Sequence, residues 1–387
     1  MKFVVIGAGA TGGYFGGQLA KANKDVTFVA RGDHYTALKA RGLEIYSAQE
    51  RITFPVSVVE TPDQVGRCDV VLLAVKCYDL ERAITQIEPI VGPDTRVLCI
   101  QNGVDAPEMA ARRFGPERIL GGLTRIEAVL LAPGVVGHFS TFAKFAFGAW
   151  ERENGPFEQQ LFAELRHAGV DCELSPDVRK ALWEKMLGLC PVAASTSLTR
   201  STLGEILSCP ESRAMHVAAI EEIALVARAV GVDLGADATE RALRWHETLA
   251  PSVRASMARD LEAGRRVELD QLSGTVARMG RELGVPTPMH AMIYAALKPL
   301  ALAAQERHRA SGEPRLYFGE YLVRAGRITN EQLTSILRLL KLEEGRGAPL
   351  RVGDALVQLG LVARETVEGL KEQYDVLLAE RGRNTVW

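Results

Sequence analysis

Residues 2–12 read KFVVIGAGATG, a short apolar run followed directly by the pattern G-x-G-x-x-G. Such glycines permit a tight turn and a close approach of backbone to a pyrophosphate, which then lies at the positive end of the following helix. The run DVTFVA over 25–30 predicts a second strand where a dinucleotide-binding unit needs one. The predicted loop residues are Gly7, Gly9, Ala10, Thr11 and Gly12.

Further apolar segments extend this unit. Near-continuous apolar runs over 69–75 and 95–101 are typical of parallel strands covered on both faces, and helical patterns separate them. The alternation over 43–59 predicts an antiparallel excursion, and the glycine-rich stretch 121–149 predicts antiparallel strands at the end of the unit. The expected fold class is therefore α/β, with a Rossmann-type doubly wound sheet over residues 1–172 that binds a dinucleotide.

The pattern becomes helical from about residue 176 to 309, where apolar residues recur three and four apart. This predicts an all-α substrate domain over 173–308. The polar stretch Glu306–Arg315 has the composition of a linker.

An internal repeat follows. FGEYLVRAGRITNEQL from Phe318 and VGDALVQLGLVARETV from Val352 match at an offset of 34 residues. Two copies are too few for a solenoid, which needs about three or more. We expect a paired helical accessory module over 315–387.

Composition excludes several classes of protein. A length of 387 residues allows about two or three domains. The net charge of −2 gives no field that would draw the chain to nucleic acid or to an anionic membrane. The longest apolar runs, such as 70–75, are far shorter than the roughly 20 residues of a membrane helix, and no signal peptide is visible. Six cysteines show no C-x-x-C spacing, and five lie in strand-like or helical segments, which indicates reduced thiols in a cytoplasmic protein.

Polar residues follow three of the predicted strands. Arg31 stands where an NAD enzyme usually has an acidic residue. Because an arginine can pair with a 2′-phosphate, this residue favours NADPH as the cofactor. The alternative is a loop arginine that contacts only solvent. Lys76 follows the strand at 69–75 and is either a second phosphate contact or a surface lysine. Asn102 follows the next strand, either in a simple turn or over the nicotinamide crevice.

Two charged residues stand out in the helical half. If residues 181–190 form a helix, Lys185 lies at the edge of an apolar face, from which it could also extend to solvent. Glu268 would share an apolar stripe with Leu272 in a helix predicted from about Arg265 to Leu283. A carboxylate in that position must be paired or protonated, which makes it a candidate functional group.

Over about residues 1–308 the chain resembles the ketopantoate reductase family (2-dehydropantoate 2-reductases). Beyond the glycine loop and Arg31, the resemblance rests on V-K at Val75-Lys76, Q-N-G at Gln101–Gly103, L-W-E-K at Leu182–Lys185 and S-M-x-x-D-x-x-x-G-R-x-x-E-x-D from Ser256 to Asp270. It implies an NADPH-dependent oxidoreductase without a metal that reduces a small-molecule 2-oxo acid, first of all 2-dehydropantoate to pantoate.

The resemblance also implies residue roles. Lys185 resembles the catalytic lysine, which would stabilise the developing alkoxide and donate its proton. Glu268 resembles the glutamate that holds substrate and lysine in register. Ser256 resembles a serine on the substrate carboxylate, and Asn102 the asparagine near the nicotinamide and the lysine. The implied cofactor contacts are Gly7, Gly9, Ala10, Thr11, Gly12, Arg31, Lys76 and Asn102.

One departure concerns the substrate. Leu189 and Ala193 stand where the family usually has asparagines, and each lost hydrogen bond weakens binding by about 0.5–1.5 kcal/mol. Arg125 or Arg254 could supply a replacement contact to the carboxylate. The alternatives are a reductase of another branched or smaller 2-oxo acid, and a regulatory protein that senses NADPH.

The tail over 315–387 resembles the N-terminal domain of type II secretion and type IV pilus ATPases, some of which bind cyclic di-GMP. The second copy fits that domain's repeat at Arg351, Gly353 and Gln373, whereas Tyr317 replaces the arginine in the first. The resemblance implies a tail that binds a protein partner or cyclic di-GMP, with a plain interaction or dimerisation module as the alternative. The apolar stripes of the helical half are sufficient to support a homodimer.

Overall fold

The computed structural model describes residues 1–47, 51–311, 352–358 and 361–380, and the single positions 322, 328 and 336. The chain divides into two compact units. The first unit comprises residues 1–194, 214–246 and 268–294, and the second comprises residues 195–213, 247–267 and the chain from 295 onward.

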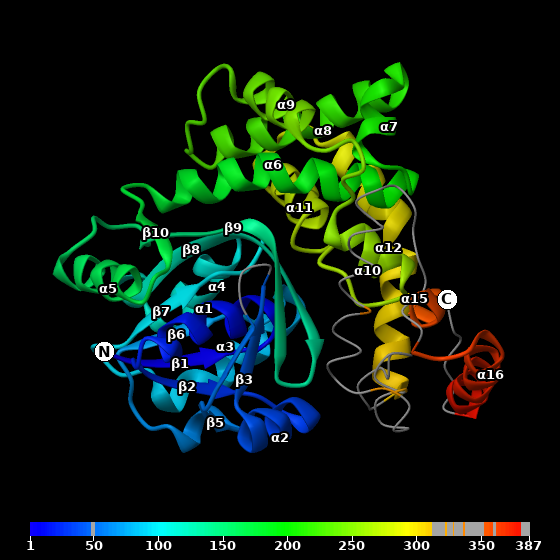
Figure 1. Cartoon of the computed structure of the whole chain (residues 1–387). Helices are drawn as coiled ribbons and strands as arrows, with labels where there is room; N and C mark the ends of the chain where they lie inside the picture. Colours follow the sequence, from blue (N-terminus) through cyan, green and yellow to red (C-terminus); the bar gives the residue numbers. More distant parts are fainter. Residues whose placement is uncertain are drawn as a thin grey trace. The chain divides into compact units, whose positions relative to one another are not determined.

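The described residues of the first unit form a 10-stranded sheet. Six strands run parallel in the order β5-β2-β1-β6-β7-β8, as expected for apolar runs joined by helices (Figure 1). Their bounds are β1 (Lys2–Ile6), β2 (Asp25–Val29), β5 (Ser57–Val59), β6 (Val70–Leu73), β7 (Arg96–Cys99) and β8 (Ile119–Ala132).

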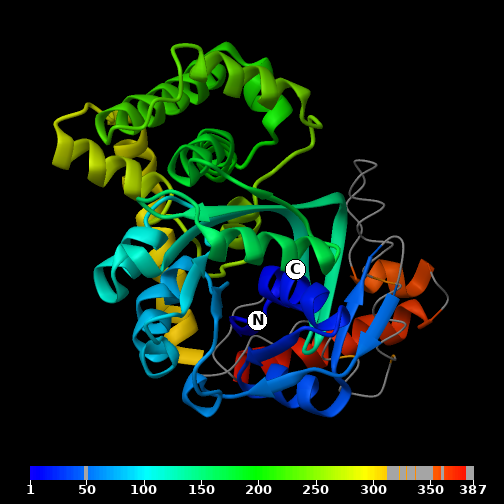
Figure 2. The same cartoon turned by 90° about the vertical axis from the view of Figure 1, so that its left-hand side faces the viewer.

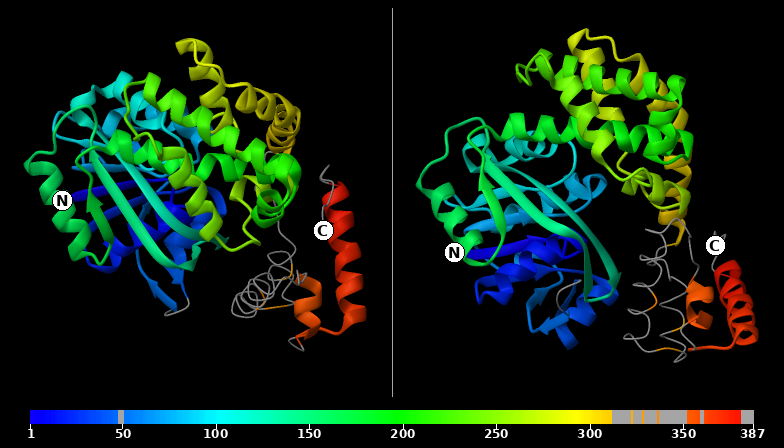
Figure 3. Two further views of the ribbon diagram at one scale, coloured as in Figure 1. Left: turned by 90° about the horizontal axis from the view of Figure 1, so that it is seen from above. Right: turned by 45° about the horizontal axis from the view of Figure 1, so that its top comes forward.

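Antiparallel pairing extends this sheet on one side. β9 (Val135–Ala149) returns along β8, and the two form a long hairpin that confirms the prediction for 121–149 (Figure 3). β3 (Leu43–Tyr46) is antiparallel to β4 (Arg51–Phe54), as predicted for the start of 43–59, and parallel to β9. β5 departs from that prediction, because it pairs in parallel with β2. β10 (Asp171–Leu174) adds to β9 in parallel.

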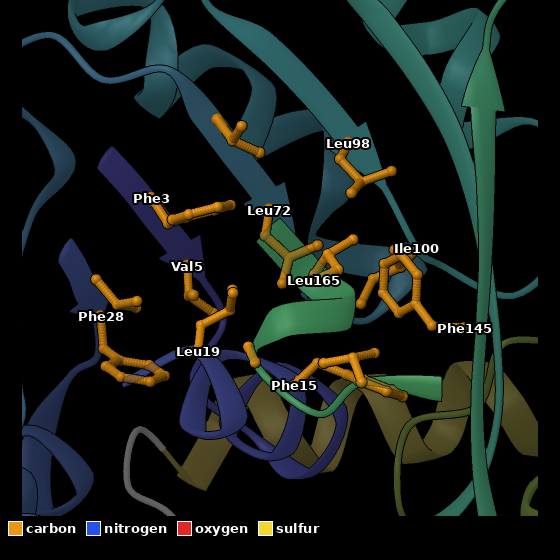
Figure 4. Packing of buried hydrophobic residues seen from close by; sticks show 14 of the residues in the cluster. Phe3, Val5, Phe15, Leu19, Phe28, Leu72, Leu98, Ile100, Phe145 and Leu165 are labelled. Atoms are coloured by element: carbon orange, nitrogen blue, oxygen red, sulfur yellow. The ribbon is translucent and has the colours of Figure 1, made fainter. Parts of the chain in front are cut away.

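Helices line the sheet and complete its core (Figure 2). In Figure 4, aromatic and aliphatic side chains of the strands, such as Phe3 and Phe28, gather near Phe15 and Leu19 of α1. Burying each such side chain contributes about 1.5–3 kcal/mol. The helices of this part are α1 (Ala10–Lys21), α2 (Gly32–Arg41), α3 (Leu80–Ile87), α4 (Ala106–Phe114) and α5 (Pro156–His167), with short 3₁₀ turns at Pro62–Gln64, Cys77–Asp79, Glu88–Ile90 and Pro116–Arg118.

The predicted helical character of 176–309 is confirmed. The helices are α6 (Val178–Thr199), α7 (Leu203–Ser208), α8 (Pro210–Ala229), α9 (Ala238–Thr248), α10 (Ser256–Glu262), α11 (Ser273–Leu283) and α12 (Pro288–Ser311). α12 continues to Ser311, so the first residues of the stretch predicted as a linker are helical.

The helix predicted from Arg265 to Leu283 is wrong in its first half. α11 begins at Ser273, because Leu272 has the non-helical torsion angles φ −105° and ψ −100°. The residues before it form turns, one of them closed by the N–H of Leu272 donating to the carbonyl of Glu268 at 3.2 Å. Glu268 therefore lies in a loop, where its side chain is not confined to a helical stripe.

Part of the tail lies within the described residues. The second repeat copy contains α15 (Val352–Gln358) and α16 (Arg364–Glu380), which confirms its helical character. The first copy lies outside the described residues except at 322, 328 and 336.

Five of the six cysteines are buried and free, as predicted, and Cys209 is free and exposed. Across the described residues we find no helix long and apolar enough to cross a membrane. The same part of the chain holds no group of side chains arranged to bind a metal ion.

Candidate active site

The glycine loop connects β1 to α1 at a point where the backbone has little room. Gly7 has φ +95°, a conformation that side-chain-bearing residues rarely adopt, and a Cβ there would lie 2.8 Å from the backbone nitrogen of Val75. A Cβ on Gly12 would lie 2.2 Å from the carbonyl oxygen of Gly7. At Gly9, the N-cap of α1, a Cβ would meet nothing within 4 Å. The loop thus leaves open space beside the N-terminus of α1, which fits a pyrophosphate.

Ala10 and Thr11 form the start of α1. The first turn of this helix has no acidic residue, so nothing there opposes an anion. The neighbouring strands β1 and β6 are the point at which the strand order reverses, where ligands of such sheets bind. Lys76 follows β6 and Asn102 follows β7 at the same edge, as the sequence predicted.

A hydrogen-bonded network joins four segments that are separate in the sequence. The ammonium of Lys185 in α6 donates to Oδ1 of Asn102 at 2.9 Å. Nδ2 of Asn102 donates to Oε2 of Glu268 at 3.3 Å, and the backbone N–H of Cys77 donates to Oε1 of the same carboxylate at 3.1 Å. The Cys77 thiol donates to the backbone carbonyl of Asn102 at 3.1 Å. Asn102 therefore links the lysine to the glutamate and is held at both ends.

Glu268 is ionised in this network. Its exposed fraction is 7%, and burial alone would raise its pKa. The charge of Lys76, whose Nζ lies 3.6 Å from Oε2, and the hydrogen bonds from Cys77 and Asn102 oppose burial and bring the pKa below its ordinary value. A buried carboxylate must be either paired or protonated, and Glu268 is paired.

Lys185 is half-buried and points inward to Asn102, not outward to solvent. Burial lowers its pKa to about 8, against the opposing effect of Glu268 and Cys77, and the charge of Arg125 lowers it further. At pH 7 the ammonium form still predominates by about tenfold. Lys185 is thus a cation that can release its proton close to neutral pH.

Arg31 occupies a different setting from Lys185. It is the exposed N-cap of α2, directly after β2, and its Nη2 donates to Oε1 of Gln86 at 2.7 Å. Partial burial and the nearby charge of Arg82 lower its pKa, while Asp79 opposes them. Arg82 and Gln86 were not singled out in the sequence, although their spacing of one helical turn in α3 could have indicated a shared face.

The remaining candidates lie on α6, on α10 and just before α10. Ser256 is the first residue of α10 and belongs to the second unit. Arg254, in the same unit, pairs with Glu262. On α6, Leu189 is half-buried and Ala193 is buried.

Two family models match most of the chain. The model described as ketopantoate reductase PanE/ApbA matches residues 3–152, and the model of that family's C-terminal region matches residues 177–301. A 2-dehydropantoate 2-reductase of Mesorhizobium japonicum is 30% identical over 326 residues, which cover 78% of this chain and 98% of that protein. The chain belongs to the ketopantoate reductase family. Both models end before the tail.

Other relatives agree with this membership. An uncharacterized oxidoreductase of Bacillus subtilis, YkpB, is 33% identical over 301 residues, covering 77% of this chain and 98% of its own. The crystal structure of a ketopantoate reductase of Ralstonia eutropha has a TM-score of 0.73 at 30% identity and covers 79% of this chain and 100% of its own. A D-mandelate dehydrogenase solved with NADH and anilino(oxo)acetate shares the fold, with a TM-score of 0.72 at 22% identity, over 79% of this chain and 99% of its own. As a member of the ketopantoate reductase family, the chain is a nicotinamide-dependent oxidoreductase that acts on CH–OH groups.

Proposed function

We propose that this protein is an NADPH-dependent 2-oxo acid reductase, and that 2-dehydropantoate, reduced to pantoate, is the first substrate to test. The observation that carries this proposal is the buried connection from Lys185 through Asn102 to Glu268. It combines a proton donor with a pKa of about 8 and an ionised carboxylate in one network. That combination suits a reaction in which a carbonyl oxygen gains negative charge and then a proton.

In the proposed reaction, NADPH held at the glycine loop and Arg31 would supply the hydride to the carbonyl carbon. Lys185 donates a proton from Nζ to the carbonyl oxygen, which becomes the hydroxyl, and regains its proton from solvent. Asn102 fixes the ammonium by accepting from it, and Glu268 fixes the amide of Asn102 in turn. The negative charge of Glu268 also keeps the pKa of Lys185 from falling further, so that the acid is charged when substrate arrives. We assign Ser256 to the substrate carboxylate on family resemblance alone.

The cofactor roles follow the loop and the charges at the ends of the strands. The pyrophosphate would lie at the start of α1, held by Gly7, Gly9, Ala10, Thr11 and Gly12. Arg31 would bind the 2′-phosphate that distinguishes NADPH from NADH, and the nearby charge of Arg82 supports this, because two adjacent cations favour an anion. Lys76 would make a further contact, since its side chain is half-exposed beside Glu268.

A second candidate is a reductase of a different 2-oxo acid with a shorter or less polar side chain. The supporting observation is the apolar pair Leu189 and Ala193 on α6, one and two turns after Lys185. A pocket that does not offer an amide gains little from a substrate hydroxyl, which must then give up its hydrogen bonds to water.

Steady-state kinetics with NADPH separate these candidates. The matched pair of substrates is 2-dehydropantoate and 3,3-dimethyl-2-oxobutanoate, which has the same skeleton without the 4-hydroxyl. A higher kcat/KM for 2-dehydropantoate supports the first candidate, and an equal or higher value for the analogue supports the second. If the protein bound NADPH but turned over no member of a 2-oxo acid panel, both enzyme proposals would fail and the NADPH-sensing alternative would stand.

We further propose the organisation that the sequence indicates, with an NADP-binding domain over 1–172, a substrate domain over 173–308 and an accessory module over 315–387. The five buried free thiols support a cytoplasmic location. For the module we propose contact with a protein partner or a second copy of this chain, with cyclic di-GMP as the alternative ligand. Calorimetric titration of the full chain with cyclic di-GMP tests that alternative, because absence of heat and of thermal stabilisation would remove it.

A further inference from the structure

The hairpin of β8 and β9 presents two cations on one face. Arg125 of β8 lies directly opposite Lys144 of β9, and directly opposite residues of an antiparallel pair point to the same side. The next residue, Phe145, points to the other side, into the core, where its ring centroid lies 5.0 Å from that of Phe15. Arg125 and Lys144 therefore point away from the core that Figure 4 shows.

Among the described residues, neither cation is bonded to a carboxylate. Both residues are exposed, and within the part of the chain that the structure describes neither side chain makes a hydrogen bond or an ion pair. Asp171 is in register with Lys144 on β10, but its carboxylate pairs with Arg166 at 3.8 Å. Like charges directly opposite each other on a sheet are destabilising, so an anion bound here would relieve their repulsion.

The same face of the hairpin carries the start of the lysine-bearing helix. A Cβ at Gly121, on β8, would lie 3.0 Å from Cγ1 of Val178, the first residue of α6. From this contact Lys185 lies seven residues along α6, about 10 Å. Arg125 lies four residues along β8 and on the same face, about 14 Å. Arg125 thus lies on the sheet face that the start of α6 contacts, and its charge lowers the pKa of Lys185 on that helix.

We propose that Arg125 binds the carboxylate of the 2-oxo acid beside the carbonyl group that faces Lys185. This assignment rests on the proposed function and deepens it. A guanidinium can bind a carboxylate through two parallel hydrogen bonds, which compensates for the amides absent at Leu189 and Ala193. Arg254, the other arginine that the sequence suggested for this role, is already paired with Glu262. The substrate class is therefore 2-oxo acids in their ionised form, in preference to neutral ketones of the same shape.

The test uses the full chain with NADPH and the 2-oxo acid that the panel identifies as best. Arg125→Ala should raise KM for the 2-oxo acid by about 10- to 100-fold and change kcat much less, since a charged hydrogen-bonding partner of the substrate is lost. Arg125→Lys should restore part of this binding. The matched control is Arg112→Ala, which removes an exposed arginine that pairs with Glu108, and its KM should change by less than about threefold.

A second readout separates carboxylate binding from an indirect effect. The unaltered protein should prefer the 2-oxo acid to its neutral 2-oxo amide, and Arg125→Ala should lose most of that preference while binding NADPH normally. Equal losses for the acid and the amide, a higher KM for NADPH alone, or an unchanged KM for the acid would each overturn the assignment. Absence of turnover by the unaltered protein with every 2-oxo acid would instead overturn the proposed function, and the assignment with it.

Discussion

Lys185 and Arg31 are both cations of the first unit, but the fold treats them differently. Lys185 is half-buried in a network in which Asn102 accepts its hydrogen bond and Glu268 supplies a compensating charge. Arg31 is exposed at the N-terminus of α2, where its guanidinium donates to the neutral side-chain amide of Gln86. Lys185 has a pKa near 8. Among the described residues, the guanidinium of Arg31 donates to an amide and to no carboxylate.

This difference in burial assigns proton transfer to Lys185 and cofactor recognition to Arg31. Removing an ammonium from water lowers its pKa, and a carboxylate held two links away limits that fall, so the proton becomes transferable at neutral pH. An exposed guanidinium remains charged at every working pH and can exchange water for a phosphate. Substitutions at the buried network should therefore change the rate, and substitutions at Arg31 should change the choice of cofactor.

Lys185→Ala should have the largest effect. Removal of the proton donor should lower kcat by about 10²- to 10⁴-fold, the range of general acid catalysis. The dissociation constant for NADPH, measured by fluorescence titration, should change little, because the glycine loop and Arg31 remain. An unchanged kcat would show that Lys185 is not the acid.

Glu268→Gln tests the carboxylate with a side chain of almost the same shape. Without its negative charge the pKa of Lys185 should fall below 8, so that less of the acid is protonated at pH 7.5. We expect kcat/KM to fall by about 10- to 100-fold and the alkaline limb of its pH profile to move to lower pH. A limb that stayed in place would contradict electrostatic coupling between the two residues.

Arg31→Ala should affect cofactor choice and leave the chemistry intact. Loss of a charged phosphate contact should reduce the NADPH/NADH preference by about tenfold, with kcat at saturating cofactor close to that of the unaltered protein. Arg112→Ala removes an exposed arginine that pairs with Glu108 and serves as the control. If both variants kept the preference, the assignment of the 2′-phosphate to Arg31 would be wrong.

A change of pH should alter kcat/KM of the unaltered protein less than any of these substitutions does. The reduction needs protonated Lys185, so kcat/KM should fall as pH rises through about 8, with about half of the activity left at that pH. Oxidation of the hydroxy acid needs the neutral amine and should rise over the same interval. The pKa of Glu268 lies below its ordinary value, so its acid limb should lie at lower pH than that of a free carboxyl group. Parallel profiles in the two directions would exclude a single acid–base group.

The sequence by itself determined the framework of the first unit. Apolar runs of strand length, separated by helical patterns, specified the parallel strands, and the pattern from Gly7 to Gly12 specified the loop, because both depend on neighbouring residues. Lys76 and Asn102 could also be placed, since the carboxyl ends of parallel strands meet at one edge. The repeat likewise predicted helices at α15 and α16.

Only the tertiary structure decided how the candidate site is connected. Its hydrogen bonds join residues 83, 166 and 191 positions apart, and no local pattern encodes such pairs. Glu268 was expected on a helical stripe, but the break at Leu272 places it in a loop that reaches the N–H of Cys77. Every residue except proline has a backbone N–H, so the sequence could not single out the N–H of Cys77 as a partner of Glu268. The side chains set what chemistry is available, and packing of distant segments sets which of them meet.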